Sequence, residues 1–298
     1  MAKHRIISAE PENETEEHFN QSLRPTTLDD YVGQRKLLEK LSITLTAVKQ
    51  RNEPMEHVLL HGPPGLGKTT LAHIIAKEMG THLTVTSGPA LVRPTDLVGT
   101  LTKLQSGDVL FVDEIHRLSA VVEEYLYPAM EDFEIDIILG QGPTARTIRY
   151  DLPHFTLVGA TTRESLLSPP FRSRFGYVAV LDFYSADDLA KIISRSAALL
   201  EVPISEPAAL QLASRCRGTP RIANRLLRRV RDFAEVEGDG SVEEAVVSSA
   251  LSRLQVDSAG LDKMDRRILT TLVERFSGGP VGIESLAAAI GEDRDTLE

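Results

Sequence analysis

The residues from Gly62 to Thr69 carry the most specific chemical pattern in this sequence. They read GPPGLGKT and fit G-x-x-x-x-G-K-[ST], in which backbone N–H groups at the start of a helix surround phosphate oxygens. In this pattern the lysine reaches the terminal phosphates, and the hydroxyl of the last residue ligates Mg2+. We therefore predict a nucleoside triphosphate site in which Lys68 binds phosphate and Thr69 binds the metal.

A pair of acidic residues supplies a second part of this chemistry. Asp113 and Glu114 end the apolar run VLFVDE. At the end of a buried strand, Asp113 can hold the metal through water while Glu114 orients the attacking water. Acidic residues at a strand end are a weak signal alone. Downstream of a phosphate loop, they predict hydrolysis of the nucleotide with Glu114 as a catalytic residue.

Hydrolysis also requires positive charge on the transferred phosphoryl group. A guanidinium placed there is worth about 10^3 to 10^5 in rate, which corresponds to about 4 to 7 kcal/mol. Arg172 and Arg174 in SPPFRSRFG are candidates, as is Arg221 in GTPR. The alternative for each arginine is an ordinary surface ion pair, and the residues alone do not decide between the two.

The phosphate loop and the acidic pair both follow apolar runs that we predict to be strands. The predicted strands are residues 57–61, 108–114, 155–162 and 177–183, with helical or loop sequence between them. Strands that alternate with helices favour a parallel sheet covered on both faces. From Ser185 onward the patterns are helical, at residues 185–200, 205–216, 218–237 and 241–254. After a polar break at 255–260, the sequence predicts two further helices and the start of a third.

Composition excludes several classes of protein. A length of 298 residues predicts two or three domains. The net charge of -10 argues against a protein that coats nucleic acid with a uniformly basic surface, although a local DNA site is compatible with it. Arginines cluster between Arg215 and Arg231, and we expect their helical stripe to be a solvated or interdomain surface. No stretch approaches the roughly 18 apolar residues of a membrane span.

The N-terminus and the cysteine content indicate a compartment. Residues 1–20 are acidic and lack the apolar segment of a signal peptide, so we expect a disordered tail. The single cysteine, Cys216, permits no internal disulfide and no cysteine metal cluster, which suits a reducing compartment. We therefore expect a cytoplasmic protein.

Several motifs, taken in order, resemble those of the AAA+ ATPases. They are LRPTTLDDYVGQ, GPPGLGKTT, LFVDEIHRL, ATTR, FRSRFG and GTPR. More narrowly, residues 121–163 resemble the RuvB family, bacterial motors that drive Holliday junction branch migration. The resemblance covers nearly the whole chain after the tail. It implies an α/β fold with an AAA+ P-loop parallel-sheet domain at 21–184, a small helical lid at 185–256 and a winged-helix head at 257–298.

The resemblance also implies roles for individual residues. Arg174 matches the arginine finger that enters the neighbouring subunit's site, with Arg172 as a helper, and Arg221 matches the sensor 2 arginine. Thr161 or Thr162 matches sensor 1, and the sequence leaves this choice open. The implied cofactors are ATP and Mg2+, the latter held by Thr69 and Asp113. The full set of implied ATP-binding positions is Leu23, Arg24, Tyr31, Val32, Gly62, Gly65, Leu66, Gly67, Lys68, Thr69, Thr70, Asp113, Glu131, Asp132, Phe133, Thr161, Thr162, Arg172, Arg174, Tyr184, Pro220 and Arg221.

Two segments suggest partners. Residues 134–151 alternate apolar and polar positions around Gly140, Gly142 and Pro143, which predicts a hairpin. By resemblance this hairpin docks RuvA through Ile148 and Tyr150; the alternative is that both side chains cover the sheet or a neighbouring subunit. The last segment resembles a winged-helix head in which Arg294 contacts DNA phosphate. Because the chain ends within the expected recognition helix, we expect this head to be truncated.

The resulting hypothesis is a homohexameric ATPase that translocates DNA. It would drive Holliday junction branch migration with RuvA, and with the RuvC resolvase, in recombination and in DNA repair during the SOS response. The alternatives are a clamp loader or replication initiator, a protein unfoldase, and a nucleotide-gated DNA-binding regulator. An unfoldase needs an aromatic pore loop, and residues 91–107 contain no aromatic residue.

Overall fold

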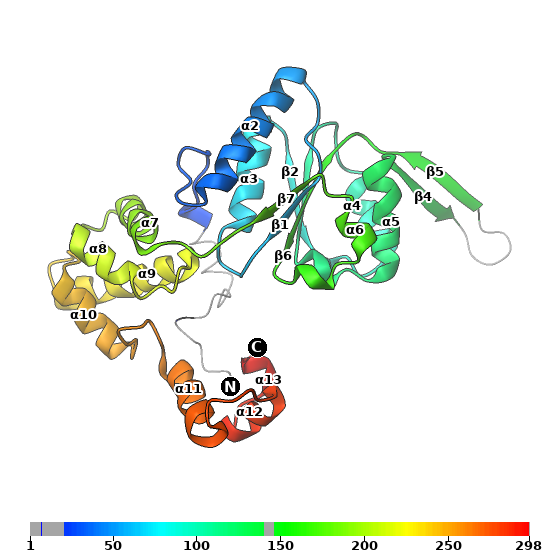
Figure 1. Ribbon diagram of the computed structural model, residues 1–298. Coiled ribbons are helices and arrows are strands. Elements are labelled where there is room, and N and C mark those ends of the chain that lie inside the picture. The colour runs from blue at the N-terminus through cyan, green and yellow to red at the C-terminus, as the bar shows by residue number, and fades with distance from the viewer. Residues whose placement is uncertain (1–6, 8–20, 140–145, 298) are drawn as a thin grey trace. The chain divides into compact units, whose positions relative to one another are not determined.

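The computed structural model describes residue 7 and residues 21–139 and 146–297. The chain divides into two compact units (Figure 1). The sheet unit comprises residues 24–182, and the helical unit combines residues 183–298 with the segment up to Leu23. Among the described residues, no helix has both the length and the apolar character needed to cross a membrane.

The sheet unit is built on five parallel strands in the order β2-β3-β6-β1-β7. The strands are β1 (Val58–His61), β2 (Leu83–Ser87), β3 (Val109–Asp113), β6 (Thr156–Thr161) and β7 (Tyr177–Val180). The central strands β1, β3 and β6 are apolar runs that are buried almost throughout, as expected for a parallel sheet covered on both faces. The edge strand β2 was not predicted, because its residues are mostly half-buried and form no apolar run.

Helices cover both faces of this sheet, with α2 and α3 on one face and α4, α5 and α6 on the other (Figure 1). Their bounds are α2 (Arg35–Arg51), α3 (Lys68–Met79), α4 (Pro94–Leu101), α5 (Ala120–Glu131) and α6 (Pro169–Arg172), and the short 3-10 helices are η1 (Gly88–Ala90), η2 (Ile115–Arg117) and η4 (Glu164–Leu166). Leu97 of α4, Leu126 of α5 and Phe171 of α6 join strand residues in one buried cluster. The expected doubly covered parallel sheet is therefore present.

A β-hairpin is inserted between β3 and β6, which are neighbours in the sheet. Its strands, β4 (Glu134–Leu139) and β5 (Arg146–Asp151), pair in an antiparallel arrangement, with Ile137 opposite Ile148. Because β3 and β6 pair directly with each other in the main sheet, the hairpin cannot lie between them, and it extends outward (Figure 1). The predicted turn residues Gly140, Gly142 and Pro143 lie outside the described residues.

The described part of the helical unit contains two groups of helices. The first comprises α7 (Ala186–Leu199), α8 (Glu206–Ala213), α9 (Pro220–Glu237) and α10 (Glu244–Arg253), and the second comprises α11 (Lys263–Phe276), α12 (Ile283–Ile290) and α13 (Arg294–Leu297). An ion pair of 3.1 Å between Arg217 and Asp265 links the loop before α9 to α11. Of the two expectations for the arginine stripe on α9, a solvated surface and an interdomain surface, the first does not hold for Arg225, which is 4% exposed. Its long aliphatic stem allows an arginine to be buried on an otherwise apolar helix face.

Candidate active site

The phosphate loop joins the end of β1 to the start of α3, and two of its glycines are required by its geometry. Gly62 and Gly67 have φ values of 151° and 104°. A Cβ on Gly62 would lie 2.6 Å from the carbonyl oxygen of Leu181, and one on Gly67 would lie 2.6 Å from the hydroxyl of Tyr31. That hydroxyl donates to the carbonyl of Leu66 at 3.3 Å. Tyr31 therefore lies directly against the loop.

Lys68 is the first residue of α3, and its side chain folds back onto the loop. Its Nζ donates to the carbonyls of Gly62 at 2.7 Å and Pro63 at 2.9 Å, and the residue is 6% exposed. The ammonium and the N-terminus of α3 thus bring positive charge to one place, which suits an anion such as phosphate. The hydroxyl of Thr69 follows in the first turn of the helix, where it is half-buried.

The acidic pair lies at the same edge of the sheet, because β3 is parallel to β1. Glu114 has φ 46° and ψ 46°, a left-handed conformation that few residues other than glycine adopt. The turn is stabilised locally, since the backbone N–H of Glu114 donates to Oδ1 of Asp113 at 2.9 Å. Its carbonyl packs so closely on Gly88 that a Cβ there would lie 2.4 Å away. Strain of this kind is common at functional sites.

The two threonines at the end of β6, Thr161 as its last residue and Thr162 directly after it, occupy different positions. Thr161 is fully buried; its Oγ1 accepts the backbone N–H of Arg163 at 3.0 Å and lies 2.9 Å from Nδ1 of His116. Thr162 is half-buried, and its hydroxyl donates to Oε2 of Glu114 at 3.2 Å. The structure therefore brings Thr162 beside the acidic residue and places Thr161 behind it.

His116 is a site residue that the motif analysis missed. Its Nε2 lies 3.3 Å from Oε2 of Glu114, and its side chain is 7% exposed. Burial lowers the pKa of His116, and the nearby Glu114 carboxylate opposes this shift. The available signal was its position in DEIHRL, two residues after Glu114.

Arg174 lies at the edge of the sheet opposite the phosphate loop. It precedes β7, and β7 runs parallel to β1 with Tyr177 opposite Val58, whereas the loop follows the far end of β1. The guanidinium is held on α5, 4.1 Å from the ring centroid of Tyr127 and 3.2 Å from Glu131. Arg174 therefore does not join the phosphate loop of its own chain.

Arg172 has a different partner. It pairs with Oε1 of Glu164 at 2.6 Å, and Oε2 of Glu164 lies 3.2 Å from Nδ1 of His61 at the end of β1. Glu164 was not predicted, because it belongs to no recognised motif; it begins the short 3-10 helix η4. The neighbouring arginines of FRSRFG are thus held by acidic residues from different parts of the sheet unit.

The implied nucleotide-proximal residues Glu131, Asp132 and Phe133 lie at the C-terminal end of α5 and directly after it, and Glu131 pairs with Arg174. The ring of Phe133 packs against His154 with a centroid separation of 4.1 Å. The adjacent carbonyl of Met130 lies 3.0 Å from Nε2 of His57, just before β1. These residues therefore share the edge of the sheet from which the strands begin.

The remaining implied positions are divided between the units. Val32 and Arg24 belong to the sheet unit, where the charge of Arg24 adds to burial in lowering the pKa of His73 on α3. The positions in the helical unit are Leu23, Tyr184, Pro220 and Arg221. Pro220 and Arg221 begin α9, and the backbone N–H of Tyr184 donates to the carbonyl of Gly218 at 2.9 Å.

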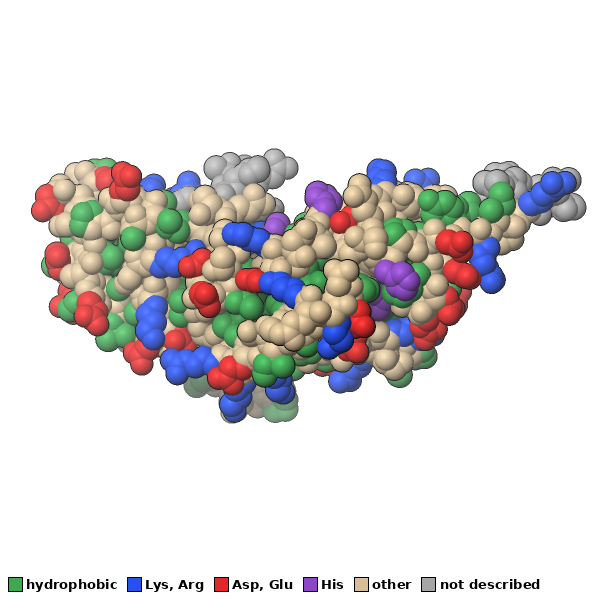
Figure 2. Space-filling model, turned by 90° about the horizontal axis from the view of Figure 1, so that it is seen from above, with side chains coloured by type: hydrophobic (Ala, Val, Ile, Leu, Met, Phe, Trp, Pro, Cys, Tyr) green, Lys and Arg blue, Asp and Glu red, His purple; other side chains and the backbone are tan. Residues whose placement is uncertain are grey.

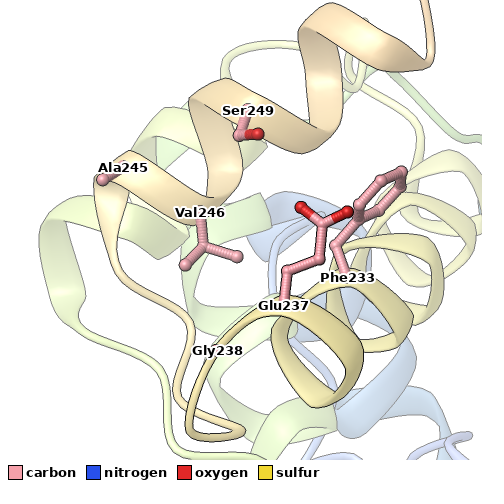
Figure 3. Close-up of a pocket in the computed structure, with 6 residues that line it drawn as sticks. All are labelled: Phe233, Glu237, Gly238, Ala245, Val246 and Ser249. Carbon is pink, nitrogen blue, oxygen red and sulfur yellow. The ribbon is translucent and has the colours of Figure 1, made fainter.

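A pocket in the helical unit lies between α9 and α10 (Figure 3). Its lining residues are Phe233, Glu237, Gly238, Ala245, Val246 and Ser249. Arg253 pairs with the Glu237 carboxylate and lies 5.6 Å from the ring centroid of Phe233. Because the one charged lining residue is an acid, this pocket does not provide a phosphate site, and we assign it no role.

The fold and the site together define a P-loop ATPase of the AAA+ class. A glycine-rich loop, a lysine, an acidic pair and polar residues after β6 meet at the carboxyl ends of a parallel sheet, where ligands of open α/β sheets bind. The strained turn at Glu114 and the helix N-terminus at Lys68 belong to this arrangement.

Comparisons with known proteins identify the family within this class. Residues 23–181 match the Holliday junction DNA helicase RuvB P-loop domain, residues 184–257 the RuvB AAA lid domain, and residues 258–298 the RuvB C-terminal winged helix domain. The chain belongs to the RuvB family. The predicted family and fold class are confirmed.

Solved structures agree with this assignment. The Thermotoga maritima RuvB Holliday junction branch migration motor is 51% identical, with a TM-score of 0.83 over 93% of this chain and 88% of that chain. A lysine-to-arginine mutant of Thermotoga maritima RuvB is 52% identical, with a TM-score of 0.84 over 92% of this chain and 87% of that chain.

Proposed function

We propose that this chain is the subunit of a homohexameric, ATP-driven motor that moves DNA during Holliday junction branch migration. The family assignment supports the activity, and the separation of Arg174 from its own phosphate loop supports the assembly. The proposed setting is recombination and DNA repair in the cytoplasm, including the SOS response, in cooperation with RuvA and the RuvC resolvase.

The proposed nucleotide chemistry assigns one task to each group at the carboxyl edge of the sheet. Lys68 and the loop N–H groups bind the ATP phosphates, and Glu114 orients the attacking water. Thr69 and Asp113 present the hard oxygen ligands that Mg2+ prefers. Among the described residues, no group of three or more His, Cys, Asp or Glu side chains could hold a metal by itself. Oxygen atoms of ATP would therefore supply the remaining ligands of the ion, and the ion would neutralise phosphate charge.

The single observation that carries the proposal is the position of Arg174. A guanidinium that stabilises the transferred phosphoryl group must lie within contact distance of it. Arg174 lies at the other edge of its own sheet, so the site that it serves belongs to a neighbouring subunit. Each ATP site would then combine Lys68 and Glu114 of one subunit with Arg174 of the next, and Arg221 would act from the lid.

A mixing experiment tests this arrangement. Lys68→Ala protein, which keeps its finger, is combined with Arg174→Ala protein, which keeps its phosphate loop. We expect the mixture to recover ATPase activity well above the sum of the separate rates, because a Lys68→Ala subunit supplies Arg174 to an intact site. In the control mixture, a Lys68→Ala/Arg174→Ala double variant replaces the Lys68→Ala protein and should give no recovery. Strictly additive rates would contradict the proposal.

The proposed partners act at two further places. RuvA would dock on the hairpin at Ile148 and Tyr150, which are 50% and 42% exposed. Duplex DNA would contact the winged helix through Arg294, which is exposed and lies 3.3 Å from Glu284. Contacts to phosphate suit a motor that must pass any sequence, and they make DNA binding strongly salt-dependent.

A further inference from the structure

His116 lies between Glu114, which follows β3, and Thr161, the last residue of β6. It belongs to η2, directly after the acidic pair, and both of its ring nitrogens face polar side chains. Nδ1 is 2.9 Å from Oγ1 of Thr161, and Nε2 is 3.3 Å from Oε2 of Glu114. The ring therefore connects the buried threonine of β6 to the acidic residue proposed to orient water.

The Glu114 carboxylate favours one tautomer of the neutral His116 ring. A carboxylate only accepts hydrogen bonds, so the ring directs its proton, and not a lone pair, from Nε2 toward Oε2, 3.3 Å away. Nδ1 is then an acceptor, and the hydroxyl of Thr161, whose oxygen accepts the backbone N–H of Arg163 at 3.0 Å, donates to it. Burial lowers the pKa of His116 and so favours the neutral ring.

Two polar groups contact the same oxygen of the Glu114 side chain. Oε2 accepts the hydroxyl of Thr162 at 3.2 Å, and Nε2 of His116 lies 3.3 Å from it. Two donors from different elements restrict the rotation of the carboxylate, and they leave Oε1 as the oxygen that would accept the proton of a water. The backbone of Glu114 is itself held in a left-handed turn, which sets the direction in which this side chain leaves the chain.

We propose that His116 is a positioning residue that orients the Glu114 carboxylate for hydrolysis, with its own tautomer fixed by Thr161. This inference rests on the proposed role of Glu114 in ATP turnover. The chain of contacts runs from the Arg163 backbone through Thr161 and His116 to Glu114. It predicts that Thr161 influences catalysis through the imidazole and not by contact with the nucleotide.

Substitution of His116 tests the first link. In the full chain with RuvA and junction DNA, we expect His116→Ala to lower kcat by about 10-fold or more, because misplacement of a catalytic group by about 1 Å can cost about 10^2 in rate. The Kd for ATP should change by less than about 3-fold, because Lys68 and its loop are intact. His116→Gln, whose amide N–H2 can replace Nε2–H, should restore most of kcat. Equal kcat in His116→Ala and wild type, or no rescue by glutamine, would overturn the proposal.

A double-mutant cycle tests the second link. Thr161→Val, which preserves shape but removes the hydroxyl, should lower kcat in the wild-type chain and add little in the His116→Ala chain, because coupled residues are not additive. Additive effects would overturn the role of Thr161, as would loss of ATP affinity in parallel with kcat. Glu114→Gln serves as the reference variant. If Glu114→Gln retains wild-type turnover, the proposed role of Glu114 is wrong. If turnover is lost in Glu114→Gln but retained in His116→Ala, only the inference about His116 is wrong.

Discussion

At the scale of the single residue, His57 shows how one buried side chain joins several parts of the sheet unit. It lies just before β1, where Leu157 of β6 donates its backbone N–H to Nδ1 at 2.9 Å. Its Nε2 lies 3.0 Å from the carbonyl oxygen of Met130, at the end of α5. A neutral ring with its proton on Nε2 satisfies both contacts, and burial lowers the pKa of His57 accordingly.

This arrangement predicts acid sensitivity. The unfolded chain binds a proton at His57 near pH 6.5, while the folded chain does so only at lower pH, so the free energy of unfolding decreases as pH falls below 6.5. Above pH 6.5 both states are neutral and the contribution of His57 is fully present. We expect His57→Gln to be less stable overall but to show a smaller loss of unfolding free energy between neutral pH and pH 5.5, measured by urea denaturation. An unchanged pH slope would contradict this prediction.

At the scale of the element, the hairpin has an apolar face that begins in the core and continues to the protein surface. Ile135, Ile137, Ile148 and Tyr150 share this face, since Ile135 pairs with Tyr150 and Ile137 with Ile148. Ile135 is 1% exposed within the core, whereas Ile148 is half exposed. Figure 2 shows hydrophobic side chains beside basic and acidic ones where the hairpin extends at the right-hand end. The alternative that these side chains cover the main sheet does not explain their exposure.

We expect Ile148→Ser to weaken RuvA binding by about 10-fold or more, because burial of an apolar side chain is worth about 1.5 to 3 kcal/mol. Basal ATPase activity should be unchanged, since the hairpin contributes no group to the phosphate loop. Arg149→Ser is the matched control: Arg149 points to the opposite face, where it pairs with Glu134 and Asp136. Titration of RuvA by calorimetry measures both variants, and equal losses would exclude a specific apolar contact.

Helix α5 is a second element with a defined task. Glu123, Tyr127 and Glu131 are four residues apart and therefore share one face. Glu123 accepts the hydroxyls of Tyr127 and Ser168, the residue that caps α6, while Tyr127 and Glu131 contact Arg174. The orientation of Arg174, the proposed finger, thus depends on the helix that leads into the hairpin.

At the scale of the whole molecule, the sheet unit carries on opposite edges the groups that we propose to complete one site between two subunits. Lys68 and Glu114 lie at the carboxyl ends of the strands, and Arg174 lies where the strands begin. In the proposed ring, head-to-tail contacts would bring these two edges together between copies. The proposal therefore predicts that catalysis depends on assembly, while nucleotide binding by the loop does not.

Dilution distinguishes catalysis, which should require assembly, from nucleotide binding, which should not. We expect the ATPase rate per subunit to fall on about a hundred-fold dilution, because dissociation removes Arg174 from the adjoining site. The Kd for ATP should change far less, since the loop, Lys68 and the acidic pair belong to one chain. Steady-state turnover and nucleotide titration measure the two quantities. A constant rate per subunit in a species shown by sedimentation to be monomeric would contradict the model.

The sequence by itself determined those features of this protein that are encoded by residues close together in the chain. The phosphate loop is defined by glycine freedom, a lysine and a helix start within a few residues, and the acidic pair follows a strand that is recognisable as an apolar run. The strands β1, β3, β6 and β7 were predicted for the same reason. The edge strand β2 was not, because its half-exposed residues lack that signal.

Only the tertiary structure decided which groups meet. The contacts of His116 with Thr161, Thr162 with Glu114, and Arg174 with Glu131 join residues 45, 48 and 43 positions apart. These contacts follow from the strand order β2-β3-β6-β1-β7, which sets β6 between the acidic strand and the phosphate loop. Strand order reflects burial of both sheet faces by helices distant in sequence, so no local pattern encodes it.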